Sequence, residues 1–458
     1  MSQWVDSNGM IDNLPKEVNL NNDRFNNVRI FIRQIASKIK MSNHFLRSFV
    51  FLGLIGICIL SGCSVSNLEP NDNLAPKTSN PLSDPGAASR TIPNSYIIVF
   101  KENVKYRGNL ANVKAKAIAL MRAQGLLESN INFYYSHSIL GFAANLSRTI
   151  ADKIANDSEV EFVEIDQVIN SSGLEDGDPV KGKNGTAPVE AIPPGILSIG
   201  GFTEFNPKDT THRAWIIDSG IDNHPDLNIN YTLGFSCFQD KLGMPDKLDY
   251  QGHGTHVAGI IGALKNKEGI IGVAAGYPVI PVRVLDSTGR GSISTVIAGI
   301  NHVGDKGIKG DVANISWTCA LSRALDNAVS KASQNKGVKF VIAAGNERDD
   351  ANLYSPGHIN GPNIFTIAAH DNVYAKPAFA ASFSNYGNPD PIDFIAPGMS
   401  IYSTFLVSKG SYAYMSGTSM AAPHVTGLLL VGEKVDTNGT ITYQLATYPR
   451  AYKHNTSP

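Results

Sequence analysis

The sequence predicts an α/β protein whose main part is a doubly wound parallel sheet, preceded by a small α+β unit. From about residue 193 to residue 435, continuous apolar runs alternate with helical patterns. Such runs are typical of parallel strands that are buried on both faces. The 42 glycines and 24 prolines favour many tight turns, which suits a loop-rich α/β domain better than a helical bundle.

The small α+β unit is predicted over residues 95–168. Its expected elements, in chain order, are a strand at 96–100, a helix at 110–127, two strands within 133–146, a helix at 148–156 and a strand at 159–166. Strands and helices in this order are typical of ferredoxin-like folds.

The main domain is predicted over residues 193–435. Its buried strands are expected in the runs RAWIID, VIPVRVL, VANIS, KFVIAAG and IFTIAA, and its helices at 254–264, 294–306, 321–335 and 419–431. In doubly wound domains of this kind, functional groups collect at the carboxyl ends of the strands.

The composition excludes some function classes. A formal net charge of −1 over 458 residues, without a long Lys/Arg run, gives no electrostatic basis for binding nucleic acid or an anionic membrane surface. Apart from Cys58 and Cys63 near the N-terminus, only Cys237 and Cys319 remain. Two cysteines are too few for a disulfide framework or a structural zinc site, and the sequence leaves open whether they are bridged or simply buried.

The N-terminal region indicates export. Residues 49–60 form an apolar run that is too short to span a bilayer but suits the core of a signal peptide. LSGC at 60–63 resembles the lipobox of bacterial lipoproteins, which predicts that Cys63 is lipidated. The alternative is a short buried helix with an incidental cysteine. Because signal peptides begin near the initiator, Met41 is the expected start.

These observations divide the chain into seven segments. The expected order is a non-native upstream extension (1–40), a signal peptide with lipobox (41–63), a flexible tether (64–94), the α+β unit (95–168), a linker (169–192), the α/β domain (193–435) and a polar C-terminal tail (436–458). The linker is rich in Gly, Asp, Lys and Pro, and exposed linkers are where proteolytic nicking is easiest.

Three motifs carry chemically useful side chains. RAWIIDSGID ends a buried strand at Asp218, HGTHVAG places His253 at the start of a helix, and SGTSMAAPHVTG places Ser419 at a glycine-bearing turn before an apolar helix. A metal interpretation would use His253 and His256, but their spacing is three rather than four and no Glu follows the first, unlike the zincin pattern. The motifs instead indicate a nucleophile, a general base and an orienting acid.

In the order Asp, His, Ser, the strings DSG, HGTHVAG and GTSMAAP resemble the signatures of the subtilases, peptidase family S8. This resemblance covers roughly residues 193–431. YIIVFKE, LGFAANLS and VEFVEID resemble the inhibitory propeptide of the same family, an inhibitor I9-type domain. The resemblance implies a serine endopeptidase that is made with its own inhibitor.

The resemblance also implies a role for each motif. Ser419 attacks the scissile carbonyl and forms an acyl-enzyme, His253 is the general base and Asp218 holds the imidazolium. Asn346, in AAGNE at 343–347, donates its side-chain amide to the oxyanion. No cofactor is required for this chemistry.

The family binds a protein or peptide substrate as an added strand between two edge segments. The residues expected at this cleft are Gly289, Gly291 and Ser292 on one side and Ser316, Trp317, Thr318, Ala344 and Gly345 on the other. Thr318 departs from the family, which has glycine there. A β-branched residue is expected to crowd the substrate backbone and alter selectivity.

A structural calcium site is also expected from the resemblance. Asp226 in HPDL and Asn266 in the loop after the His253 helix match a common family site. The loop, KNKEGI, departs from the family pattern and adds two lysines.

The sequence therefore predicts a lipid-anchored serine endopeptidase of the cell envelope, at the outer membrane in a Gram-negative host, or extracellular after release. Its expected partners are protein or peptide substrates, its own propeptide and the membrane through the lipid anchor, but not nucleic acid. The alternative is a catalytically silent binding lipoprotein on the same scaffold, since fold alone does not prove activity.

Overall fold

The computed structural model describes residues 90–171, 174–175, 189–208, 211–371, 379–387, 390–432, 434–444 and 446–454. The predicted upstream extension, signal peptide, Cys63 and most of the tether lie outside the described residues. Among the described helices, none combines the length and the apolar character needed to cross a bilayer.

The N-terminal α+β unit has the predicted alternation of strands and helices. Its elements are β1 (Thr91–Phe100), α3 (Leu110–Ala123), the 3₁₀ turn η2 (Glu128–Asn130), β2 (Ile131–Tyr135), β3 (Gly141–Asn145), α4 (Arg148–Ala155) and β4 (Val160–Asn170). The strands lie in the order β4-β1-β3-β2 and neighbouring strands are antiparallel, as in ferredoxin-like folds. The unit has its own apolar core, which includes Ile98, Phe142 and Met121.

The main domain is built on a nine-stranded sheet in the order β20-β21-β17-β16-β14-β12-β7-β10-β8. All neighbouring pairs are parallel except β20 with β21, so the predicted doubly wound parallel sheet is confirmed. The central strands are β7 (Ala214–Asp218), β8 (Phe235–Ser236), β10 (Val279–Arg283), β12 (Val312–Ile315), β14 (Lys339–Ala343), β16 (Ile364–His370) and β17 (Ile392–Pro397).

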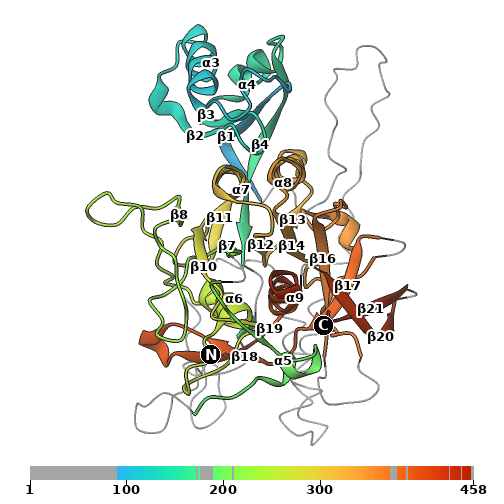
Figure 1. Ribbon diagram of the computed structural model, residues 1–458. Helices are drawn as coiled ribbons and strands as arrows, with labels where there is room; N and C mark the ends of the chain where they lie inside the picture. The colour runs from blue at the N-terminus through green and yellow to red at the C-terminus, as the bar shows by residue number, and fades with distance from the viewer. Residues whose placement is uncertain are drawn as a thin grey trace, which may run out of the picture. The chain divides into compact units, whose positions relative to one another are not determined.

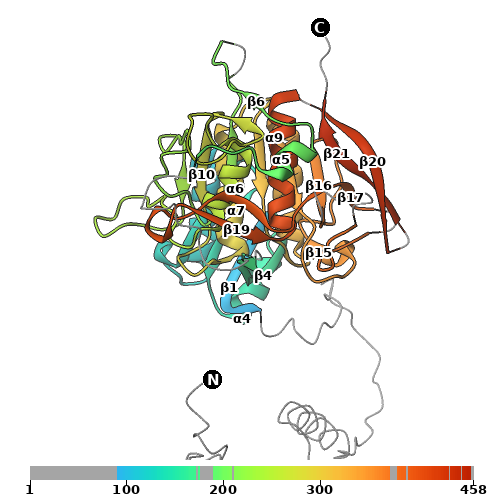
Figure 2. The same cartoon turned by 90° about the horizontal axis from the view of Figure 1, so that it is seen from below.

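Helices cover both faces of this sheet (Figures 1 and 2). The four long helices are α6 (His253–Gly262), α7 (Ile293–Lys306), α8 (Arg323–Lys336) and α9 (Thr418–Gly432). Along β7, Ala214 and Ile216 belong to the core under α6 and α9, whereas Trp215 and Ile217 belong to the core under α7 and α8. Burial on both faces explains why the strands are continuous apolar runs.

The switch point of the sheet lies between β7 and β12. From β7 the chain continues to β8 and β10 on one side, and it then returns to add β12 on the other side. Their carboxyl ends, at Asp218 and Ile315, are therefore adjacent. In open α/β sheets, this crevice is where ligands bind.

The main domain also contains shorter elements. They are α5 (Pro194–Ser198), β6 (Thr203–Glu204), β9 (Ala274–Ala275), β11 (Arg290–Ser292), β13 (Cys319–Ala320), η4 (Ala351–Leu353), β15 (Tyr354–Ser355), β18 (Ile401–Thr404), η5 (Val407–Lys409) and β19 (Tyr412–Ser416).

The C-terminal region differs from the predicted polar tail. Residues 436–454 contribute to a hairpin, β20 (Val435–Tyr443) and β21 (Ala446–Lys453), and β21 pairs with β17 at Ile395. Asn438 and Gly439 lie inside β20 where its register with β21 shifts. The sequence hides this hairpin because most of the β20 side chains are exposed and polar.

Both ends of the predicted linker contribute to strand pairs or bridges with the main domain. β4 extends to Asn170 and pairs with β11 in an antiparallel arrangement, while β5 (Leu174–Glu175) pairs with β19. Further along, Val189 and Ala191 form bridges to Glu268 and Ile270. Only residues 176–188 of this region, with Ser172 and Gly173, lie outside the described residues.

A buried carboxylate anchors the start of β7. Asp311 accepts hydrogen bonds from the Arg213 guanidinium (Nη2, 2.8 Å) and from the Trp215 indole (2.9 Å), and both Asp311 and Trp215 are fully buried. Removing one partner of a buried pair leaves the others without compensation. Asp311 therefore fixes the strand that ends at Asp218.

We expect Asp311→Ala to lower the free energy of unfolding by about 3 kcal/mol. The matched control is Glu204→Ala, whose exposed ion pair with Lys265 should contribute less than about 1 kcal/mol. Urea unfolding followed by circular dichroism measures both. Equal effects of the two substitutions would contradict this role of Asp311.

Candidate active site

Asp218 and His253, far apart in the sequence, meet at the end of β7. The His253 Nδ1 atom lies 2.9 Å from each carboxylate oxygen of Asp218, and both residues are fully buried. The backbone N–H of Ser219 also donates to Asp218 Oδ1 at 2.7 Å. The carboxylate therefore fixes both the ring orientation and the tautomer of His253, so that Nδ1 carries the proton.

The start of α6 holds His253 in this position. A Cβ on Gly254 would lie 2.2 Å from the Gly220 carbonyl oxygen and 3.2 Å from the Asp218 Cβ, so only glycine lets the helix approach β7 this closely. Asp249, which none of the sequence motifs includes, accepts hydrogen bonds from the N–H groups of Gly252 and Thr255, both at 2.9 Å. A carboxylate shortly before a helical histidine was the available signal, since Asp is a preferred helix cap.

The surroundings change the proton affinity of His253. Burial by itself lowers the pKa of an imidazole, but the charge and hydrogen bond of Asp218 raise the pKa of His253, and the net shift is upward. His256, one turn along the same helix, has no such partner, and burial lowers its pKa to about 3. An imidazole with raised basicity next to a carboxylate is suited to accept a proton.

Ser419 lies in the first turn of α9 and is hydrogen-bonded to Ser316, the residue that follows β12. Ser419 Oγ donates to the Ser316 carbonyl, and Ser316 Oγ donates to the Ser419 carbonyl, both at 2.8 Å. Pro423, four residues further along α9, has no N–H to donate to the Ser419 carbonyl. This proline leaves that carbonyl available for Ser316.

The hydroxyl of Ser419 points toward Ser316 rather than toward His253 in this state. His253 Nε2 is buried and has no hydrogen-bond partner among the described residues. Reactive hydrogen bonds of this type often form only when substrate is bound. Rotation of the Ser419 side chain is the movement that would bring its hydroxyl to the imidazole.

Asn346 follows β14 and contacts the same turn. Its Oδ1 accepts hydrogen bonds from the Thr418 backbone N–H at 2.8 Å and from the Thr418 hydroxyl at 3.0 Å. This fixes the amide so that Nδ2 lies beside Gly417, 3.2 Å from where a Cβ on that glycine would be. The side-chain N–H₂ is therefore close to the backbone that precedes Ser419.

The metal interpretation has no support in the described part of the chain. His256 Nε2 lies 3.0 Å from the Ile401 carbonyl and 3.1 Å from the Ala413 carbonyl, so it donates there and is not directed at His253. No group of three or more His, Cys, Asp or Glu side chains that could hold a metal ion is found within the described ranges.

The predicted cleft edge at Gly289, Gly291 and Ser292 lies alongside the end of β4. Gly291 pairs with Ile169 and Ser292 with Val168, and the Ser171 N–H donates to the Gly289 carbonyl at 2.8 Å. Ile169 is buried in the core beneath α7. The chain itself thus occupies the edge that was expected to bind an extended peptide.

The residues predicted for the opposite edge are Ser316, Trp317 and Thr318. The Trp317 indole is buried and donates to the Ile217 carbonyl at 2.9 Å, so its side chain belongs to the core. The Thr318 hydroxyl lies 3.1 Å from where a Cβ on Gly345 would be, and its methyl group lies 3.6 Å from the same position on Gly357. Thr318 therefore fills space between two glycine-containing segments.

Ala344 and Gly345 form the backbone between β14 and Asn346. The Ala344 N–H donates to the Ile367 carbonyl, and the Gly345 N–H donates to the Thr418 hydroxyl at 3.1 Å. Gly345 has φ +104°, a conformation that favours glycine. These two residues hold the Asn346 segment against the start of α9.

Asp226 and Asn266, the expected calcium ligands, lie together, but hydrogen-bond donors surround them. The Asp226 carboxylate accepts from Asn266 Nδ2, the Ile270 N–H and the Tyr412 hydroxyl, each at 3.1 Å. Burial raises the pKa of Asp226 to about 7. Calcium takes six to eight oxygen ligands, and this arrangement does not fit such a site.

The Glu190 carboxylate binds the backbone of the same loop. Its Oε1 accepts from the backbone N–H groups of Asn266 and Lys267, both at 2.6 Å. Lys267 has φ +78°, and successive N–H groups in such a turn favour an anion. The loop is thus held by hydrogen bonds to Asp226 and Glu190.

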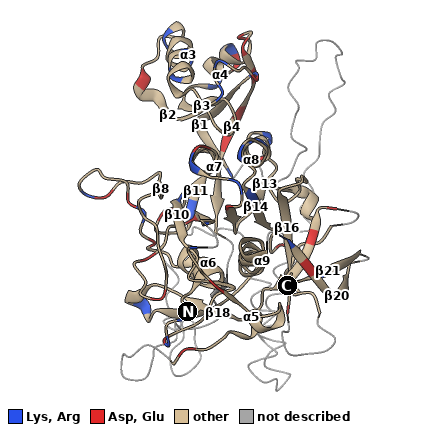
Figure 3. Cartoon of the chain, viewed as in Figure 1, with Lys and Arg blue, Asp and Glu red and all other residues tan. Residues whose placement is uncertain are grey.

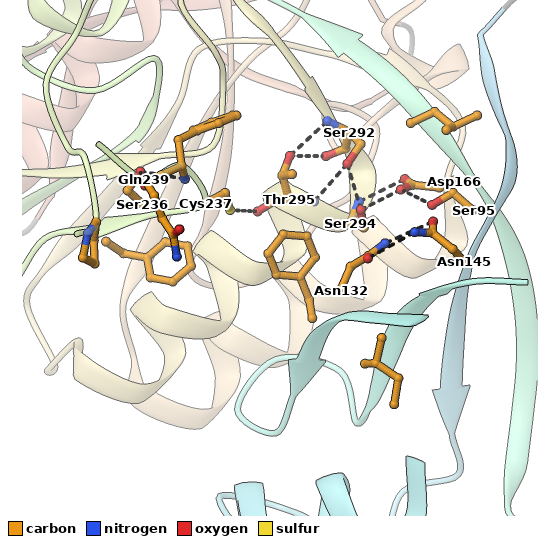
Figure 4. A pocket seen from close by; sticks show the side chains of 16 residues that line it. Ser95, Asn132, Asn145, Asp166, Ser236, Cys237, Gln239, Ser292, Ser294 and Thr295 are labelled. Carbon is orange, nitrogen blue, oxygen red and sulfur yellow. Dashed lines mark hydrogen bonds between the residues drawn. The ribbon is translucent and has the colours of Figure 1, made fainter. Parts of the chain in front are cut away.

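The two cysteines of the described chain are both free thiols. Cys319 is buried at the cleft edge, and Cys237 is partly buried. Burial raises the pKa of both thiols above the ordinary value. Cys237 also lines a cleft at the junction of the α+β unit and α7, together with Asn132, Asp166 and Ser294 (Figure 4).

Comparison with known proteins gives a consistent result. The family model described as Subtilase family matches residues 215–440, and the model described as Peptidase inhibitor I9 matches residues 95–171. An "Extracellular serine proteinase" of Thermus sp. (strain Rt41A) is 33% identical over 386 residues, which cover 82% of this chain and 87% of the relative.

Two further relatives are longer than this chain. The "Alkaline serine exoprotease A" of Vibrio alginolyticus is 33% identical over 74% of this chain and 60% of its own length. "Cerevisin" of Saccharomyces cerevisiae is 33% identical over 78% of this chain and 59% of its own length.

We expect the pKa of His253 to lie above its ordinary value in the unaltered site and to fall in Asp218→Asn, because burial then acts without the carboxylate. NMR titration of the ring protons in a Ser419→Ala background measures this pKa. His256 is the internal control and should stay neutral between pH 5 and pH 9. The same His253 pKa with and without the carboxylate would show that Asp218 does not set it.

Proposed function

This chain belongs to the subtilase family, and from that premise we propose that Ser419, His253 and Asp218 are the catalytic triad of a serine endopeptidase. The single observation that carries the assignment is the buried contact of His253 Nδ1 with both oxygens of Asp218, next to the first turn of α9. The enzyme is made with an attached inhibitor I9 propeptide.

Catalysis begins when the Ser419 hydroxyl leaves the Ser316 carbonyl and turns to His253 Nε2. The hydroxyl gives its proton to Nε2 as the oxygen attacks the substrate carbonyl, and His253 later delivers that proton to the leaving amine. Asp218 stabilises the imidazolium and does not itself accept the proton. Water then hydrolyses the acyl-enzyme on Ser419 by the same route.

Asn346 is proposed to stabilise the oxyanion of the tetrahedral intermediate. Its Oδ1 is occupied by Thr418, so its N–H₂ is held toward the turn that carries Ser419. The Ser419 backbone N–H, at the N-terminal end of α9, is the second donor.

The attached propeptide is proposed to inhibit by filling the cleft. Residues 168–171 lie along β11 and residues 174–175 lie along β19, so the chain enters the cleft on one side and leaves it on the other. We place the processing bond between Ser171 and Leu174. Cleavage there leaves Glu190 in the mature enzyme, where it holds the Asn266 loop.

The membrane anchor is proposed from the sequence alone. LSGC at 60–63 follows the apolar segment 49–60, and lipidation of Cys63 would retain the enzyme at the cell envelope. The Thermus relative is named as extracellular, which agrees with export.

Fluorophosphonate labelling tests the proposed function. After the full-length chain has processed itself and the propeptide has been removed, the label should attach to Ser419 and be absent from Ser419→Ala. A properly folded chain that neither processes itself nor takes the label would instead support the silent scaffold. Intact mass of the same samples locates the processing bond and shows whether Cys63 carries lipid.

We expect Asn346→Ala to lower kcat about 100- to 1,000-fold with little change in KM, because the lost donor acts mainly on the transition state. Steady-state hydrolysis of a peptide substrate measures both constants. Asn352→Ala, an exposed Asn in the neighbouring loop, is the matched control. A KM effect without a kcat effect would assign Asn346 to substrate binding instead.

We expect Thr318→Gly to widen the cleft between Gly345 and Gly357. The ratio of kcat/KM for a bulky over a small side chain next to the cut should rise at least about 10-fold, as is typical when a few methyl-sized groups are removed from a pocket. Peptide libraries compare the two enzymes. Identical cleavage profiles would remove this role of Thr318.

A further inference from the structure

The strand β4 crosses the N-terminal ends of α7 and α8 before it reaches the cleft (Figure 1). Asp166 lies at the start of α7: it accepts hydrogen bonds from the Ser294 N–H at 3.0 Å and from the Ser294 hydroxyl at 2.6 Å. Figure 4 shows its carboxylate between Ser294 and Ser95, which donates at 3.1 Å. Asp166 is almost fully buried.

Glu164 makes the equivalent contact with α8. It accepts hydrogen bonds from the Ser322 hydroxyl and, at 3.0 Å, from the Ala324 N–H. Figure 3 shows acidic residues on β4 where it passes α7 and α8. Because Glu164 and Asp166 are two residues apart, they project from the same face of the strand.

These contacts satisfy backbone groups that the helices cannot satisfy themselves. The first N–H groups of a helix have no partner within it, and an acidic side chain is favoured there. Burial raises the pKa of Glu164 to about 7 and also raises the pKa of Asp166. In either protonation state, an acid still offers an oxygen to the helix N–H.

The attached propeptide makes a second set of hydrogen bonds to these helices, and a linear strand could not make them. Asn301 Oδ1 accepts the backbone N–H groups of Ser136, His137 and Ser138 at 2.8, 2.7 and 3.2 Å. This loop belongs to the folded α+β unit. The contacts of β4, in contrast, are available to any extended chain that runs along the same path.

We infer that the processed enzyme carries a substrate-binding exosite at Ser294, Ser322 and Ala324, which binds acidic side chains upstream of the cleavage site. Once the propeptide leaves, the donors that held Asp166 and Glu164 face solvent. A substrate strand paired with β11 continues past them, as β4 does. The exosite rests on the proposed peptidase function and defines its preferred substrates.

The spacing of the preferred motif follows from the register of β4. Val168 is the first residue of β4 that pairs with β11, and its partner there is Ser292. Asp166 and Glu164 lie two and four residues before Val168. The exosite therefore selects extended segments with two acidic residues separated by one residue, followed by the strand that enters the cleft. Glu164, Asp166 and Val168 give this pattern in the chain itself.

Matched synthetic peptides test the exosite. The parent peptide has the sequence of residues 162–175, FVEIDQVINSSGLE. Its variants carry Glu164→Ala with Asp166→Ala, or Gln167→Ala as the control on the opposite face, and a short peptide has residues 168–175 alone. With the processed enzyme, we expect kcat/KM of the parent and of the Gln167→Ala peptide to exceed that of the other two about 10-fold, given the strength of hydrogen bonds to acidic groups.

A double-mutant cycle assigns the effect to the helix. For each enzyme, kcat/KM of a peptide is divided by kcat/KM of the short peptide. In the Ser294→Ala enzyme, Asp166→Ala in the peptide should lower this ratio less than it does in the unaltered enzyme. If Asp166→Ala lowers kcat/KM by the same factor in both enzymes, the acidic side chain does not bind at Ser294.

The outcomes separate the exosite from the peptidase activity. Equal kcat/KM for the parent, the doubly substituted and the short peptide would overturn the exosite and leave the peptidase intact. If no peptide is cleaved, the proposed function fails. Fluorescence anisotropy with labelled peptides then decides the exosite by binding alone, and equal affinities of the parent and doubly substituted peptides would overturn it.

Discussion

The N–H groups at the start of each buried helix need acceptors, and this constraint organises the whole catalytic domain. Asp249 accepts hydrogen bonds from N–H groups at the start of α6, and this helix positions His253. Asn346 Oδ1 accepts a hydrogen bond from the Thr418 N–H in the first turn of α9. This contact positions both the Asn346 side-chain amide and Ser419. The same requirement that stabilises the helices therefore places the reactive side chains.

The propeptide meets the same requirement from outside the domain. α7 and α8 have their own caps, Ser292 and Ser322, but Asp166 and Glu164 supply further acceptors at each start. Leaving a buried donor unsatisfied costs about 1–3 kcal/mol. An inhibitor that satisfies such donors adds polar contacts to the apolar ones that Ile97, Tyr135 and Ile169 make in the core under α7 and α8.

The parallel sheet and its long helices could be predicted because their signals are local. Runs such as RAWIID and KFVIAAG are apolar throughout, since the strands are covered on both faces. The identities of Asp218, His253, Ser419 and Asn346 came from short specific motifs, and the structure brings these residues to neighbouring strand ends and helix starts. That they act together in catalysis stays a prediction.

The features that the sequence did not reveal depend on contacts between distant segments. Asp249 precedes α6 by a few residues, but its role depends on where the turn before His253 folds back. The donors around Asp226 come from Asn266, Ile270 and Tyr412, and no local pattern predicts that they meet. β5 and β11 are two and three residues long and exist only because a partner strand lies beside them.

The hairpin of β20 and β21 has a consequence for solubility. β20 forms one outer edge of the nine-stranded sheet, and an unpaired edge is a template for strand pairing with other molecules. Its side chains are mainly exposed Thr, Asp and Asn, and the register shift at Gly439 interrupts its regular pattern. Polar side chains and irregular edges discourage such pairing, so the C-terminal strands protect the enzyme from aggregating through its own sheet.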